Sequence, residues 1–262
     1  MEIPYNLGMD KIEEFKILKD KFTNLFPSKK NIEIEKSIEH FMCTNIMYEE
    51  NELSEWYEKC LRDLDATIEK IDINDCNLWS SDSSGNIKHS SGQFFRVTGI
   101  RVNNSSSREV GEKGWDQPIL SEVNQDGGIL GLVRTYIKGL PHYLVEAKFE
   151  PGNYNLIQLS PTLQATFSNL NRAHGGTKPI YSEFFDDYDT NKEDYIFNQW
   201  LSEDGGRLLN KRNLGLVKNV DYEKISNIEA RFNWVSLYQI KNFLNNGTFV
   251  NPHLARLIFM HQ

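Results

Sequence analysis

The stretch ILGLVRTYIKGLPHYLVEAKF occupies residues 129–149. β-Branched and aromatic side chains fill both of its halves, which is typical of β-strands. Gly139, Leu140 and Pro141 separate the two halves with residues that favour a turn. The sequence therefore predicts a hairpin with strands at 129–137 and 142–149, and a sheet built around it.

Further strands are expected on both sides of this hairpin, at 94–102, 156–159 and 214–217, because the same residue types recur there. Apolar residues at three- and four-residue spacing predict helices at 193–202, 234–245 and 252–260. Residues 81–92 are rich in serine, glycine and aspartate and are expected to form a polar loop. The predicted class is α+β, with a mostly antiparallel or mixed sheet and flanking helices.

The first 80 residues differ from the rest in their apolar pattern, which is helical in spacing. Apolar spacing predicts helices at 9–27, 32–47 and 52–71. On the last of these, Leu53, Trp56, Leu64 and Ile68 share one face opposite charged residues, so this face needs a partner. We therefore expect a helical N-terminal region at 1–80 and a second region at 81–262.

Charge follows the same division. The chain of 262 residues carries a net charge of −8, and residues 1–78 hold 10 basic and 18 acidic side chains, which leaves the remainder neutral. No basic face for a nucleic-acid partner is predicted. No apolar run reaches the roughly 20 residues of a membrane helix, and no leader pattern is seen, so we expect a cytoplasmic protein without membrane partners.

Metal-site patterns are missing from the sequence. The three cysteines form no CxxC pair, which favours free thiols and argues against zinc. The segment 108–114 resembles the acidic box of Nudix pyrophosphohydrolases, but it lacks that box's preceding glutamate, since Ile100 stands there, and its adjacent acid pair. No metal ligand is therefore predicted.

Three polar segments are candidates for binding and chemistry. Trp115 and Gln117 combine an aromatic plate with an amide, which suits either a capped turn or a platform for stacking a base or sugar. On a strand at 142–149, Glu146 and Lys148 share one face, and Glu150 follows where Pro151 ends the strand. Residues 158–176 are rich in hydroxyls and amides, which suit hydroxyl- and phosphate-bearing ligands, although turns and helix caps use the same residues.

These stretches together resemble the NDP-hexose 2,3-dehydratase family. The resemblance runs from about residue 38 to the end and rests on matching residues at 94–99, 115–118, 131–133, 147–148, 150–153, 158–162, 164–166, 168–169, 172, 174–176, 202–203, 206–207, 212–213, 232–234, 237, 239 and 250–251. Family members remove the C2 hydroxyl of a nucleotide-linked 4-keto-6-deoxyhexose, usually the thymidine diphosphate form, and use no redox cofactor. The resemblance implies a Nudix-like mixed sheet without the metal box. Such chains usually carry this module twice, whereas the present sequence carries it once.

The implied reaction needs a base for the C3 proton, an acid for the leaving hydroxyl and a group that stabilises the C4 oxygen. Glu150 and His174 are the acid–base candidates, without a choice between the two roles. Lys148, Tyr181 or Gln164 would stabilise the oxygen. Binding is expected from arginines for the diphosphate, aromatics for stacking and smaller polar residues, namely Arg172, Arg207, Arg212, Trp115, Tyr154, Gln117, Asn153, Gln158, Ser160, Thr162, Thr166 and Asn169.

Two alternatives follow from the single copy. The chain could be the dehydratase itself or a catalytically inert module that binds sugar nucleotides. The apolar helical face and the missing second module together predict a homodimer, although the same helices could instead pack within one chain.

Overall fold

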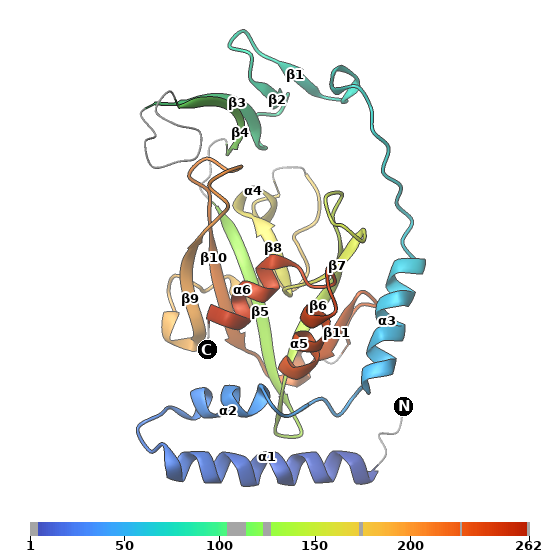
Figure 1. Ribbon diagram of the computed structural model, residues 1–262, viewed down its shortest axis with the longest axis vertical. Coiled ribbons are helices and arrows are strands. Elements are labelled where there is room, and N and C mark those ends of the chain that lie inside the picture. The colour runs from blue at the N-terminus through green and yellow to red at the C-terminus, as the bar shows by residue number, and fades with distance from the viewer. Residues whose placement is uncertain (1–4, 104–113, 123–126, 173–174, 226, 261–262) are drawn as a thin grey trace.

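The computed structural model describes residues 5–103, 114–122, 127–172, 175–225 and 227–260. It is an α+β fold with two sheets, as predicted (Figure 1). The larger sheet has the order β11-β6-β5-β10-β9. Its central members are β5 (Gly128–Ile137) and β6 (Leu140–Phe149), which pair antiparallel across the turn and confirm the predicted hairpin.

The sheet is mixed because β10 (Arg212–Asn219) pairs parallel to β5 and antiparallel to β9 (Tyr195–Ser202). On the other side, β11 (Phe232–Val235) pairs antiparallel to β6. Packing covers both faces of these strands, and β5 and β6 are accordingly buried along almost their whole length. Such two-sided burial explains their nearly continuous apolar sequence.

The hairpin forks at Thr162. Beyond the pair Val133–Leu144, β5 and β6 no longer pair with each other. β5 pairs instead with β8 (Leu163–Thr166), and β6 pairs with β7 (Ile157–Ser160). The Thr162 hydroxyl accepts from the Val133 amide at 2.9 Å and donates to the Leu144 carbonyl at 2.5 Å. One buried side chain thus replaces the ladder hydrogen bonds that the diverging strands would otherwise have made with each other.

A smaller antiparallel sheet holds β1 (Trp79–Ser81), β2 (Ile87–His89), β3 (Arg96–Val102) and β4 (Trp115–Ser121). Backbone hydrogen bonds between Leu120 and residues 207–209 join it to the loop after β9. Figure 1 shows it beyond the end of the large sheet that lies opposite the β5–β6 turn.

Helices cover the large sheet. The N-terminal helices α1 (Tyr5–Leu25) and α2 (Asn31–Glu39) lie beneath the β5–β6 turn in Figure 1, and α3 (Glu50–Arg62) runs beside β11. α5 (Leu237–Asn245) and α6 (Pro252–Met260) cover one face. The short helical elements are α4 (Phe167–Leu170), η1 (Ile73–Asp75), η2 (Ser182–Phe185), η3 (Lys192–Asp194) and η4 (Tyr222–Ile225).

A buried ion-pair network fixes α2 on the sheet. Arg134 of β5 is fully buried, and its guanidinium donates to Glu35 at 2.9 Å and to Glu39 at 2.7 Å. Tyr136 donates to the same Glu35 carboxylate at 2.6 Å, as does Lys19 of α1. Glu35 and Glu39 belong to the acidic N-terminal third of the sequence, so part of that acidity faces inward and neutralises a core cation.

Several predicted elements are wrong or shorter than expected. Residues 195–202 form strand β9 rather than a helix, because they pair antiparallel with β10. Phe197 and Leu201 are buried in the core cluster that includes α5 and α6, whereas Tyr195 is buried in the other cluster. The helices predicted at 32–47 and 52–71 end at Glu39 and Arg62. The expected loop at 81–92 contains the β1–β2 hairpin, and Trp115 begins a strand rather than a turn.

The apolar face of α3 is covered within the chain. Leu53 and Tyr57 are buried against residues of α5 and β7, and the Trp56 indole donates to the Ala230 carbonyl at 2.8 Å. Ile68 lies beyond the helix and is half exposed. The argument for a homodimer from this face is therefore wrong, since the face already has a partner.

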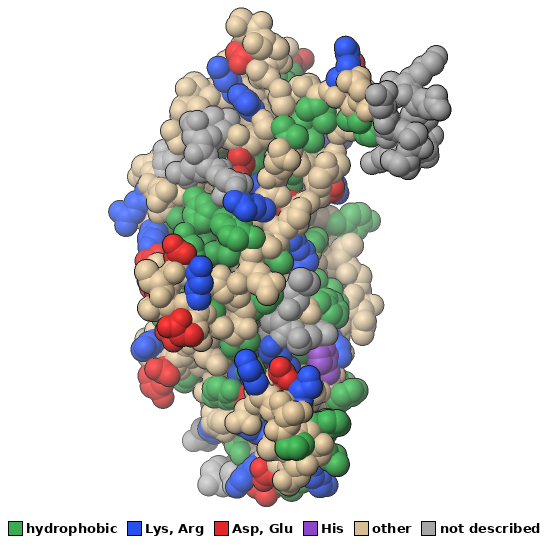
Figure 2. All heavy atoms as spheres, turned by 90° about the vertical axis from the view of Figure 1, so that its left-hand side faces the viewer, with side chains coloured by type: hydrophobic (Ala, Val, Ile, Leu, Met, Phe, Trp, Pro, Cys, Tyr) green, Lys and Arg blue, Asp and Glu red, His purple; other side chains and the backbone are tan. Residues whose placement is uncertain are grey.

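The described part of the surface shows no separation of charge by sign on the face in Figure 2, where basic and acidic side chains are interspersed. Within the described ranges, no helix combines the length and the hydropathy that crossing a bilayer requires.

Replacing Arg134 with Met should destabilise the fold by about 3–5 kcal/mol, because the Glu39 carboxylate would stay buried without its cation. Urea unfolding followed by circular dichroism measures the change. The matched control is Arg101→Met, which removes an exposed pair with Asp116 and should leave the midpoint unchanged. Equal midpoints for the two variants would contradict a structural role for the buried network.

Candidate functional site

The fork in the sheet opens a cavity of about 290 Å³ where β5, β8 and the end of β6 diverge. We call it the fork cavity. Its polar lining comes from five separate parts of the chain and consists of Glu150, Gln164, Thr166, Asn169, Glu203, Lys211, Asn213 and His253. Phe95, just before β3, and apolar residues of β5 supply the rest. Two carboxylates, an imidazole and an ammonium group thus converge on one small space.

Glu150 lies one residue beyond β6, where the chain turns through Asn153. The Gln164 amide donates to Glu150 Oε1 at 2.9 Å, and the Asn251 amide approaches Oε2 at 3.5 Å. Neutral amides, rather than an arginine or lysine, therefore hold this carboxylate. The second side-chain atom of Gln164, Oε1, is buried without a partner among the described residues.

A second carboxylate, Glu203, lies at the end of β9. Asn213 donates to it at 2.7 Å and Arg256 at 2.9 Å, which fixes its orientation. His253, in the first turn of α6, places Nδ1 at 3.8 Å from Glu203, beyond hydrogen-bond distance. Within the described residues this Nδ1 has no hydrogen-bond partner.

The charge state of His253 follows from these surroundings. Burial lowers its pKa below the usual value, Glu203 and Glu150 oppose that shift, and Arg256 and Lys211 add to it. The net effect lowers the pKa of His253 and so favours the neutral imidazole. A neutral imidazole beside two carboxylates can accept a proton and return it.

Lys211 supplies the cation of the cavity. It is nearly buried, forms an ion pair with Glu122, and its ammonium lies 5.2 Å from the centre of the Phe95 ring. An ammonium in such a place can stabilise negative charge that develops on a bound ligand.

The cavity brings together four of the residues predicted from sequence: Glu150, Gln164, Thr166 and Asn169. Lys148 lies elsewhere, 3.5 Å from Glu146, in a second cavity between α3 and the edge of β6. Tyr181 is buried in the core with its ring edge-on to Phe232 at 4.9 Å.

Several predicted binding residues have structural contacts. Thr162 holds the fork, Ser160 is fully buried, and Gln158 donates to the Thr248 carbonyl at 2.7 Å. Asn153 donates to the Lys148 carbonyl and closes the turn after β6. Tyr154, in the same turn, is 84% exposed.

Trp115 and Gln117 both lie on β4. The Trp115 indole donates to Gln117 at 2.7 Å, and Gln117 donates to the Gly206 carbonyl at 2.9 Å. These bonds link the small sheet to the loop after β9, and neither residue lines the fork cavity.

The predicted arginines also lie outside the cavity lining. Arg207 is paired with Asp204 and exposed, and the Arg212 guanidinium stacks 4.4 Å above the Trp200 ring. Arg172 is exposed and adopts a left-handed backbone with φ of 55°. His174, like the box-like segment 108–113, lies outside the described residues.

Glu203, Lys211, Asn213 and His253 were not predicted as site residues. Glu203 and Asn213 fall within the stretches that carry the family resemblance, so that resemblance was a usable signal for them. Lys211 and His253 lie outside the residues that carry the family resemblance, so no feature of the sequence indicated them. They reach the cavity only because β10 pairs with β5 and α6 packs beside β5 and β7.

Comparison with known proteins agrees with the sequence resemblance. The family model described as NDP-hexose 2,3-dehydratase matches residues 50–260. The chain is 34% identical over 186 residues to dTDP-4-dehydro-6-deoxy-alpha-D-glucopyranose 2,3-dehydratase of Streptomyces violaceoruber, covering 70% of this chain and 40% of that protein. Proteins of the same name from Amycolatopsis orientalis and Saccharopolyspora spinosa are each 33% identical, over 70% and 75% of this chain. The chain spans about two fifths of the length of these relatives.

The His253 environment makes a testable prediction. Its pKa in the folded protein should lie below 6.5, and Glu203→Gln should lower it further, because the carboxylate favours the imidazolium. An NMR titration of the histidine ring nitrogens measures both values. As a control, Glu193→Gln alters an exposed carboxylate and should leave the titration unchanged.

The same shift sets a pH dependence of stability. The folded state binds fewer protons at His253 than the unfolded state does once the pH falls below about 6.5. The stability linked to this neutral imidazole is therefore present above the unfolded pKa and is lost as pH falls through 6.5 toward the folded pKa. A pKa above 6.5 in the wild type would contradict this assignment.

Proposed function

The chain belongs to the NDP-hexose 2,3-dehydratase family, and on that premise we propose that it removes water from carbons 2 and 3 of a nucleotide-linked 4-keto-6-deoxyhexose. The observation that carries the proposal is the fork cavity, which gathers Glu150, Glu203, His253 and Lys211 in one hexose-sized space. The nucleotide is proposed to be dTDP, as the names of the relatives indicate.

The proposed chemistry starts at the acidic C3 proton, next to the C4 ketone. A base takes this proton, and the electrons of the C–H bond form an enolate with its charge on O4. When the ketone re-forms, the electrons make the C2–C3 double bond and the C2–O bond breaks. The leaving hydroxide takes a proton from an acid and departs as water. The resulting enol tautomerises to the 3,4-diketo-2,6-dideoxy sugar, so the balance needs no redox cofactor.

The groups of the fork cavity fit these roles. Glu150 is proposed as one proton-transfer group, because its carboxylate lines the cavity and, among the described residues, its hydrogen-bond partners are the amides of Gln164 and Asn251. Neutral His253, oriented beside Glu203, is proposed as the other. Lys211 is proposed to stabilise charge on O4, in place of the more distant Lys148. Base and acid are not divided between Glu150 and His253.

The second candidate is a module that binds sugar nucleotides without turning them over. It is kept because the chain spans about two fifths of the relatives, which carry the activity in their names.

Turnover distinguishes these candidates. With dTDP-4-keto-6-deoxyglucose in deuterated buffer, we expect loss of the C2 hydroxyl and deuterium at C2, where the enol takes up a solvent deuteron as it tautomerises, both followed by NMR. Intact substrate that still raises the melting temperature of the protein would favour the inert module.

Glu150→Gln should lower turnover by about 100-fold or more while preserving the fold, because the amide keeps the shape but cannot exchange a proton. Steady-state kinetics and thermal unfolding measure the two effects. Glu193→Gln, at an exposed site, serves as the control. Turnover of the Glu150 variant within a few-fold of wild type would remove this residue from the mechanism.

Further parts of the proposal concern architecture and assembly. We include a Nudix-like module at 81–262 preceded by a helical region at 1–80, a cytoplasmic location and a homodimer that buries more than about 2,000 Å². Light scattering tests the dimer, since the monomer mass is 30.4 kDa.

A further inference from the structure

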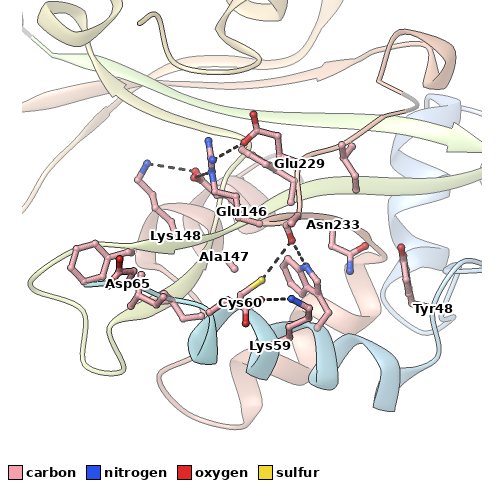
Figure 3. A pocket seen from close by; sticks show the side chains of 18 residues that line it. Tyr48, Lys59, Cys60, Asp65, Glu146, Ala147, Lys148, Glu229 and Asn233 are labelled. Atoms are coloured by element: carbon pink, nitrogen blue, oxygen red, sulfur yellow. Dashed lines mark hydrogen bonds and ion pairs between the residues drawn. The ribbon is translucent and has the colours of Figure 1, made fainter. Parts of the chain in front are cut away.

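A second, larger cavity of about 700 Å³ lies between α3 and the edge of β6 (Figure 3). We call it the α3 cavity. Trp56, Phe149 and Ile157 contribute to a mainly apolar lining. The cavity exists because β11 begins only at Phe232, which leaves the last residues of β6 without a neighbouring strand on that side.

Asn233 contributes an unusual polar group to this lining. Its side chain belongs to β11 and the residue is only 2% exposed. Oδ1 is buried without a partner among the described residues, although buried amides are normally hydrogen-bonded. In Figure 3 Asn233 and Tyr48 lie toward one end of the cavity, and Lys148 lies toward the other. A ligand with a polar edge would satisfy this amide.

A third, small space of about 100 Å³ lies beside β6 and has lining residues in common with both cavities. This space shares Glu146, Lys148 and Arg231 with the α3 cavity and Gln164 with the fork cavity. Glu146 and Lys148 of β6 and Glu150, one residue beyond it, occupy alternate positions along the chain, so successive members lie roughly 7 Å apart. The three spaces therefore follow one another along a single strand.

We propose, resting on the function proposed above, that the nucleoside diphosphate part of the substrate occupies the α3 cavity while the hexose occupies the fork cavity. The fork cavity alone lies at the lower limit of ligand-site volumes, about 300 Å³, and has no room for a nucleotide as well. The α3 cavity has that room.

The lining carries three cations, Lys59, Lys148 and Arg231, beside four carboxylates, Asp63, Asp65, Glu146 and Glu229. Several of its groups match parts of a nucleoside diphosphate. Nucleobases carry a ring N–H or amino donor beside an acceptor, and the carboxamide of Asn233 offers the complementary acceptor and donor. The apolar lining accepts the faces of a planar base. Lys148 is the cation between the two cavities. Its ammonium has three donors and touches one carboxylate at 3.5 Å, whereas Arg231 is already bound to Glu146 and Glu229.

Binding of dTDP alone, measured by titration calorimetry, tests the proposal without reference to turnover. Asn233→Leu keeps the side-chain size and should weaken dTDP binding by at least about tenfold. Asn74→Leu, at an exposed helical turn outside the cavity, should bind as the wild type does. Glu150→Gln should also keep its dTDP affinity. Unchanged affinity in a folded Asn233→Leu protein would overturn the proposal.

A second measurement avoids a buried substitution. Cys60 lines the α3 cavity and is partly accessible, whereas Cys43 and Cys76 are not part of its lining. Saturating dTDP should slow the reaction of Cys60 with N-ethylmaleimide at least about fivefold and leave the other two thiols unaffected, as followed by mass spectrometry. An unprotected Cys60 with dTDP bound would overturn the proposal, as would failure of the wild type to bind dTDP.

The two proposals fail differently. Dehydration of the substrate with Cys60 unprotected would overturn only the placement of the nucleotide. Protection of Cys60 without dehydration would overturn the dehydratase assignment and support the placement of the nucleotide.

Discussion

The hydroxyl of Thr162 takes the place of the backbone hydrogen bonds that would continue the β5–β6 hairpin, and the shape of the binding region depends on this replacement. It accepts from the Val133 amide and donates to the Leu144 carbonyl, so both strands stay satisfied while they part. Beyond this point β5 pairs with β8, and β6 pairs with β7. The divergence makes the fork cavity, and Glu150, at the end of β6, comes to lie beside Gln164 of β8. A buried hydroxyl between two backbones thus provides the opening in which a ligand can lie.

The buried charged residues of this protein mainly fix the positions of helices and side chains. Glu35 and Glu39 of α2 form buried ion pairs with Arg134 of β5, and these pairs hold α2 against the sheet. In the fork cavity, Arg256 and Asn213 bind Glu203, while the partners of Glu150 among the described residues are amides. Two carboxylates of one cavity therefore differ in their surroundings, and such differences let otherwise identical groups play different chemical parts.

Local pattern predicted the parts of the fold that depend on nearby residues. The β5–β6 hairpin, α5 and α6 follow from composition and spacing within short windows. β9 was mistaken for a helix because Ile196, Trp200 and Leu201 also fit a helical spacing, and only its pairing with β10 decides the period. In the site, Gln164, Thr166 and Asn169 come from one continuous polar segment and Glu150 directly follows a predicted strand, so these four could be predicted. Lys211 and His253 could not, because pairings between distant segments bring them there.

The parallel pairing of β5 with β10 has a consequence for the order of folding. Ile129 and its partner Leu214 are 85 residues apart, so their contact closes a long loop, whereas the β5–β6 turn closes within a few residues. During synthesis the N-terminal helices and the hairpin emerge well before β10 and α6. The chain then carries an unpaired edge of β5 until its last quarter is made, a state in which strand edges invite association with other chains. Completion of the fork cavity and protection of that edge are therefore the same late event.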